Sequence, residues 1–111
     1  MDKKNTLRIN DISFTCEGNM DEMLNKTMVV YMLTFRDKSC YIGKTERTLL
    51  SRLCEHCTNL GKIDKPRVAK INKFKEFNVS IITSANTRKK LFKKETTCIN
   101  TARELGYDVL N

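Results

Sequence analysis

The sequence contains little glycine and proline: four glycines and one proline among 111 residues. Such a composition leaves no room for a long flexible linker, so we expect the chain to be ordered nearly throughout. It also lacks any run approaching the roughly 18 apolar residues that a membrane-spanning helix needs. Its length suits one domain with one modest core and excludes a second globular unit.

The first ten residues, MDKKNTLRIN, lack the apolar segment of a secretory leader. Without a leader, an odd number of cysteines indicates a reducing compartment. We therefore expect a soluble cytoplasmic protein without a membrane partner, in the host cytoplasm if a phage encodes it. The five cysteines are Cys16, Cys40, Cys54, Cys57 and Cys98.

The formal net charge of +8 is unevenly distributed. Residues 1–30 hold four basic and five acidic side chains, whereas residues 31–111 hold seventeen basic and eight acidic ones. A basic surface on a small domain favours polyanions, of which nucleic acid is the commonest. An anionic membrane surface and an acidic protein are the alternatives, and charge alone does not choose among them.

Apolar spacing predicts an α+β domain in the order β-β-α-α-β-α, preceded by a short hairpin near residues 6–14 and a helical turn near 20–26. Asp64 and Pro66 suit the start of the second helix. Ser84 or Asn86 is expected to cap the last helix, and Gly106 to close it. The predicted strands cover 27–35, 40–43 and 78–83, and the predicted helices 45–61, 64–77 and 84–106.

The segment CEHC, residues 54–57, resembles a metal or redox motif. Structural zinc needs four ligands, and the sequence offers no second Cys/His pair at suitable spacing. Haem attachment would need the histidine after the second cysteine. Cys54 and Cys57 follow the apolar stripe of their helix, so we interpret them as small core residues, with a zinc or thiol-redox protein as a third-ranked alternative.

Arg52 and His56 lie four residues apart on one helix, where they project together as a fixed cation and a titratable imidazole. Tyr31 and Tyr41 fall on two strands of a hairpin, so their phenols can approach each other, and Gly43 permits close backbone approach. Taken alone, the first pair is more typical of a solvated helix face. The second pair is consistent with two tyrosines packed in a half-buried sheet.

Glu95 interrupts the apolar stripe of the last helix, four residues after Leu91 and four before Ile99. A carboxylate on an inward face needs a partner, and a divalent cation is a good one. The alternative is a glutamate at the edge of the stripe that pairs with Lys93, Lys94 or a lysine elsewhere.

The order of these signals resembles the GIY-YIG nuclease superfamily: VVY at 29–31, YIG at 41–43, Arg52 with His56 four residues later, and then Glu95. Val29 and Val30 stand where the family usually has Gly-Ile. The family includes intron-encoded homing endonucleases, the incision module of bacterial nucleotide-excision repair, some restriction enzymes and many small phage-borne proteins. The resemblance covers 28–111, typical of a small single-domain member of phage or mobile-element type, and leaves 1–27 as an N-terminal extension.

The resemblance implies a small three-stranded antiparallel sheet flanked by helices, and hydrolysis of a DNA phosphodiester with one divalent metal, Mg²⁺ or alternatively Mn²⁺. Glu95 would hold the metal and Arg52 the phosphate. Tyr41 would activate water within a network of Tyr31, His56 or Lys44. A free tyrosine titrates near pH 10 and would have to be acidified, whereas an unperturbed histidine would not, so the general base stays open.

Lysines and arginines on the predicted helices would then bind the DNA backbone without reading its sequence. We expect weak or structure-dependent selectivity, or dependence on an accessory DNA-binding partner or a homodimer. A DNA- or partner-binding module of the same fold without catalysis is the competing interpretation. The proposed backbone contacts are Lys44, Arg67, Lys70, Lys73, Lys89 and Lys90, and Gly43 and Asn111 are possible supporting residues.

Overall fold

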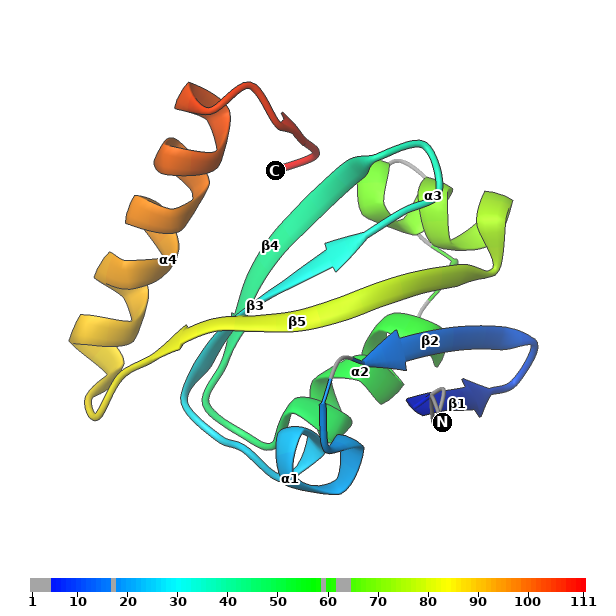
Figure 1. Cartoon of the computed structure of the whole chain (residues 1–111), viewed down its shortest axis with the longest axis horizontal. Coiled ribbons are helices and arrows are strands. Elements are labelled where there is room, and N and C mark those ends of the chain that lie inside the picture. The colour runs from blue at the N-terminus through cyan, green and yellow to red at the C-terminus, as the bar shows by residue number, and fades with distance from the viewer. Residues whose placement is uncertain (1–4, 17, 59, 62–64) are drawn as a thin grey trace.

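The computed structural model describes residues 5–16, 18–58, 60–61 and 65–111. One mixed sheet forms the centre, with α4 on one face and the other helices on the opposite face (Figure 1). Within the described part of the chain, no helix combines the length and apolar composition of a membrane span. The elements are β1 (Asn5–Ile9), β2 (Ile12–Cys16), α1 (Met20–Leu24), β3 (Val29–Thr34), β4 (Ser39–Thr45), α2 (Leu49–Thr58), α3 (Pro66–Phe74), β5 (Glu76–Ser84), α4 (Arg88–Glu104) and β6 (Asp108–Val109).

The sheet has six strands in the order β1-β2-β5-β3-β4-β6. Its centre is the antiparallel set β5-β3-β4, which corresponds to the three predicted strands. The prediction of a three-stranded antiparallel sheet is nevertheless wrong, because β2 runs parallel to β5 and β6 runs parallel to β4. The α+β class and the order of the central elements are confirmed.

The N-terminal hairpin extends this sheet rather than standing apart from it. Asn10, with a φ of 57°, lies in the two-residue turn between β1 and β2. Ile12 and Phe14 on β2 are fully buried in the main core, where the Phe14 ring stacks on Phe77 of β5 at 5.5 Å. Covering the edge of β5 is therefore one structural task of this segment.

Side chains alternate across β3 and β4 and so divide the interior into two cores. Tyr31 and Leu33 point toward α2, into the main core. Val30 and Ile42 point the other way and pack with Leu91 of α4 in a smaller core. The two faces of the sheet are named below the α2 face and the α4 face.

The helix ends differ in part from the predictions. Helix α4 begins after Thr87, whose Oγ1 accepts a hydrogen bond from the Lys90 amide at 3.2 Å. The predicted cap at Ser84 or Asn86 is wrong, because β5 continues through Ser84. Pro66 is the first residue of α3, as predicted, whereas Asp64 lies outside the described residues. Gly106 follows α4 with a φ of 88°, as expected of a glycine that ends a helix.

Candidate active site

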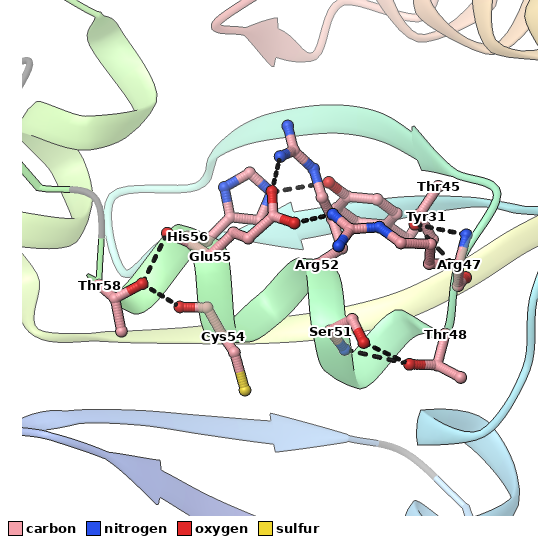
Figure 2. A network of polar contacts seen from close by, with 10 residues as sticks. All are labelled: Tyr31, Thr45, Arg47, Thr48, Ser51, Arg52, Cys54, Glu55, His56 and Thr58. Atoms are coloured by element: carbon pink, nitrogen blue, oxygen red, sulfur yellow. Dashed lines mark hydrogen bonds and ion pairs between the residues drawn. The ribbon is translucent and has the colours of Figure 1, made fainter.

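Tyr31 and His56 meet beneath the surface on the α2 face. The Tyr31 hydroxyl on β3 lies 2.6 Å from Nε2 of His56 on α2 (Figure 2). Tyr31 is fully buried and His56 is 5% exposed. The solvated-face alternative is therefore wrong for His56.

Burial sets the ionisation of this pair. It is the main cause that raises the pKa of Tyr31 above its usual value, and the neighbouring Tyr41 raises it further. Burial, reinforced by the charges of Arg52 and Arg67, lowers the pKa of His56 to about 3. Both side chains are thus neutral at pH 7, and the premise that His56 titrates near 6.5 is wrong.

Tyr41 on β4 completes the aromatic cluster. Its half-buried ring makes an edge contact with His56, with centroids 5.6 Å apart and planes at 77°. Gly43 lies opposite Tyr31 in the β3–β4 ladder, and a Cβ there would sit 2.6 Å from the Tyr31 oxygen. Only glycine at position 43 leaves room for this arrangement, since real Cβ contacts are longer.

Arg52 approaches the cluster from α2, one turn before His56. Its pKa is affected most by burial, which lowers it, but interaction with the phenols of Tyr31 and Tyr41 makes the net shift upward. Its Nη1 donates to Glu55 at 2.7 Å, and Arg47 also pairs with that carboxylate (Figure 2). Sequence reasoning missed Glu55, although its i,i+3 spacing from Arg52 is a usable signal.

Glu95 lies on the other side of the sheet. Its half-buried carboxylate on α4 is 3.8 Å from Nζ of Lys44. Lys44 follows Gly43 on β4 but points to the α4 face, where its Nζ also lies 5.4 Å from the centroid of Phe92. The described contacts pair Glu95 with a lysine and do not join it to the tyrosine–histidine–arginine cluster.

The metal-binding capacity of the described residues is small. They contain no group of three or more His, Cys, Asp or Glu side chains that could hold a metal ion. A single carboxylate still suits Mg²⁺, because this ion commonly retains waters and takes the rest of its ligands from a substrate phosphate. Glu95 is ion-paired with Lys44, so a divalent cation bound there would have to replace that lysine as the partner of the carboxylate.

The predicted backbone-binding residues do not form one continuous track. Lys73 is exposed on α3, whereas Lys89 and Lys90 are exposed on α4, across the sheet. Lys70 is ion-paired with Asp37, so part of its charge is already neutralised within the protein.

Arg67 lies apart from these lysines and within the aromatic cluster. Its Cζ is 5.0 Å from the centroid of the Tyr41 ring. The sequence placed Arg67 with the backbone-binding lysines, so this contact with a candidate catalytic tyrosine was not predicted.

Asn111 binds the backbone of β4. Its Oδ1 accepts from the Ile42 amide at 2.9 Å, and its Nδ2 donates to the Ile42 carbonyl at 2.6 Å. It therefore occupies the place of a strand partner between Tyr41 and Gly43.

The cysteines of CEHC have different environments. Cys57 is 1% exposed in the main core, as predicted, and burial raises the pKa of its thiol to about 12. Cys54 is only partly buried, and both thiols are free.

An α+β domain that gathers two tyrosines, a histidine and an arginine beside its central strands has the features of a nuclease domain. The chain belongs to the GIY-YIG family: the model of the GIY-YIG catalytic domain matches residues 27–108, most of the sequence. This is a nuclease family, and membership implies DNA as the substrate. No curated protein and no solved structure matches the chain.

The departure from the family's first motif lies in the interior. Val29 and Val30 are both fully buried, one in each core. Their side chains fill space on the two faces of β3, while Tyr31 keeps its position next to His56.

Proposed function

We propose that this protein is a metal-dependent DNA endonuclease that hydrolyses the phosphodiester bond at the edge of β4. The observation that carries the proposal is the convergence of Tyr31, Tyr41, Arg52 and His56 from β3, β4 and α2. In the described residues, strand β6 pairs with β4 only at Ser39 and Cys40, so Tyr41–Thr45 has no strand partner on that side.

Arg52 is the proposed ligand of the scissile phosphate. Its guanidinium can offer two parallel donors to phosphate oxygens and offset the charge that develops in the transition state. Glu55 holds the guanidinium beside the phenols before substrate arrives. A phosphate oxygen would exchange with the Glu55 carboxylate at the same donor.

Tyr41 is the proposed acceptor of the proton from the attacking water. Unlike Tyr31, it is partly exposed, and the cations Arg52 and Arg67 lie beside its ring. Positive charge next to an oxygen that gains negative charge lowers the energy of the transfer. The neutral Tyr31–His56 pair then fixes the position of Tyr41 rather than exchanging protons itself.

Glu95 is the proposed metal ligand, with Mg²⁺ favoured over Mn²⁺ because a lone carboxylate with water and phosphate is typical of magnesium sites. A divalent ion bound there would act as a Lewis acid toward the phosphate and the leaving 3′ oxygen. Since Glu95 and Tyr41 lie on opposite faces, the substrate would have to straddle the edge of β4. The exposed lysines of α3 and α4 lie on the two sides of this path.

Selectivity for DNA sequence is expected to be weak, because backbone contacts do not read bases. Selectivity would then come from recognition of DNA structure, from an accessory DNA-binding partner or from a homodimer.

Plasmid cleavage by Glu95→Gln tests the proposal. Supercoiled plasmid is incubated with wild type, Glu95→Gln and the control Glu104→Gln, which changes an exposed glutamate on the same helix. Each reaction is run with Mg²⁺, with Mn²⁺ and with EDTA. Wild type and the control should nick DNA with metal only, while Glu95→Gln should be slower by about 10²-fold or more.

DNA affinity, measured in EDTA, separates the alternatives. Glu95→Gln should bind DNA as well as wild type or better, because it removes a negative charge. Cleavage by Glu95→Gln at the wild-type rate would refute the assigned metal site. Salt-sensitive binding without cleavage by any of the three proteins would favour the binding module instead.

A further inference from the structure

Arg67 bridges α3 and the catalytic cluster. Its side chain leaves the first turn of α3 and places the guanidinium over the Tyr41 ring, 5.0 Å from the centroid. A guanidinium held over an aromatic face still directs its N–H donors outward in the plane of the fork. The sequence predicted a contact with the DNA backbone at Arg67, and the structure in addition holds its side chain against a candidate catalytic tyrosine.

The Nε donor of Arg67 is buried and has no hydrogen-bond partner in the described residues. The same residues give Arg67 no ion pair, whereas Arg47 and Arg52 both face Glu55. A buried charged donor without a partner is unfavourable, and such groups in native proteins call for an explanation. An anionic oxygen supplied by a ligand would satisfy it.

The charge of Arg67 reaches the rest of the cluster. It contributes to lowering the pKa of His56, after burial and Arg52. It also opposes the rise in the pKa of Tyr31, although more weakly than Arg52. Two guanidiniums, one from α2 and one from α3, therefore act on the same small group of side chains.

We propose that Arg67 is a second ligand of the scissile phosphate, with its Nε–H and one Nη–H donated to a non-bridging oxygen beside Tyr41. This inference rests on the proposed nuclease function and adds a residue to it. Arg52 and Arg67 would bind the phosphate from two helices, so the phosphate is fixed relative to the Tyr41 oxygen. A lysine would carry the charge but not the planar pair of donors.

Two substitutions of Arg67 separate charge from donor geometry. Arg67→Met keeps an unbranched stem over Tyr41 and removes charge and donors, whereas Arg67→Lys keeps the charge. Arg8→Met, which removes an exposed arginine on β1, is the matched control. Thermal melting establishes that each variant is folded.

Affinity for a short duplex is measured in EDTA over a range of salt concentrations, and the single-turnover cleavage rate with Mg²⁺ at saturating protein. Arg67→Met should reduce the slope of log K against log [salt] by about one and the rate by about 10²-fold. Arg67→Lys should keep the slope and lose about tenfold in rate. Arg8→Met should match wild type in both.

An unchanged salt slope in Arg67→Met would overturn the proposal, because the residue would then contact no phosphate. A reduced slope with a wild-type cleavage rate would also overturn it, since Arg67 would bind a flanking phosphate. If wild type fails to cleave, the proposed function fails, and the salt slope still decides whether Arg67 contacts a phosphate.

Discussion

His56 shows how burial changes the chemistry of a residue whose position in the sequence is easy to identify. The i,i+4 spacing from Arg52 predicted a titratable imidazole near the phosphate. In the fold, His56 is 5% exposed and its Nε2 is hydrogen bonded to Tyr31 at 2.6 Å. With its pKa lowered to about 3, mainly by burial, it is a weak base and serves better to hold Tyr31 and Tyr41 in place.

The sign of the pH effect follows from this shift. The unfolded chain binds a proton at His56 near pH 6.5, whereas the folded chain binds it only near pH 3. The stabilising contribution of neutral His56 is therefore present above about pH 6.5 and is lost as the pH falls toward 3. We expect His56 to account for a loss of about 2 kcal/mol in the free energy of unfolding between pH 7 and pH 5.

Urea unfolding of wild type and His56→Gln at pH 7 and pH 5 measures this contribution, because the chain has one histidine. The variant should lose about 2 kcal/mol less than wild type over this interval. In parallel, the imidazole proton resonances should stay constant from pH 8 to pH 5. A titration midpoint near 6.5 would contradict a buried, neutral His56.

The role of a single residue was predictable where a motif or a periodicity identifies it. It was not predictable where the role depends on a tertiary contact. Tyr31, Tyr41, Arg52 and His56 were identified from their order and spacing, and the structure brings all four together. Arg67 was predicted only as a contact of the DNA backbone, and its contact with Tyr41 was missed, because that contact depends on how α3 returns to β4. That return is not encoded in the local sequence.

At the scale of elements, strand β4 separates the two halves of the proposed site. The Tyr41 side chain points to the α2 face, where Gly43 leaves space for the Tyr31 ring, and Lys44 points to the α4 face toward Glu95. The position of this strand therefore determines both halves. On the edge of β4 beyond its pairing with β6, the side chain of Asn111 is hydrogen bonded to the N–H and the C=O of Ile42.

Asn111→Ala should lower the free energy of unfolding by about 1–3 kcal/mol, because the N–H and C=O of Ile42 lose their partners. The local effect should be larger than the global one: the Ile42 amide should exchange with solvent faster than the remaining amides of β4. Hydrogen exchange followed by NMR and urea unfolding measure the two effects. Asn100→Ala, at an exposed position on α4, is the control.

If the Ile42 amide of Asn111→Ala exchanges with solvent at the wild-type rate, water replaces the Asn111 side chain without loss of stability. The role of Asn111 in positioning β4 would then be withdrawn.

The elements were predictable to the extent that their signals are local. The hairpins β1–β2 and β3–β4 have short turns between β-branched runs, and both were found. The start of α4 was misplaced because Ser84, Asn86 and Thr87 are all good capping residues, and only the length of β5 selects Thr87. Strand β6, two residues long, has no periodicity to detect.

At the scale of the whole molecule, the least predictable feature is the parallel pairing of β2 with β5. The two strands are about sixty residues apart in sequence, and Ser13 pairs with Glu76. The sequence of neither strand identifies the other as its partner, because parallel pairing is decided by packing between distant parts of the chain. The family match begins at residue 27, so the first two strands lie outside it.

Strand β2 nevertheless packs into the same core as the matched region. Ile12 and Phe14 are fully buried in the same cluster as Leu33, Leu53 and Phe77. Without β2, the edge of β5 and the Phe77 ring would be exposed to solvent, and an uncovered strand edge promotes association. We therefore expect a fragment of residues 27–111 to be unstable and prone to aggregate, although it contains the whole matched region.

Phe14→Ala in the full chain tests the same dependence without truncation. It should lower the free energy of unfolding by about 3–5 kcal/mol, as other buried phenylalanines do, which is a large part of the 5–15 kcal/mol typical of a small domain. Arg8→Ala, at an exposed position on β1, should change it by less than about 0.5 kcal/mol. A cooperative urea transition of the 27–111 fragment at the wild-type midpoint would instead show that the matched region folds without the N-terminal strands, and the hairpin would then have to be explained by its contacts with DNA or a second copy.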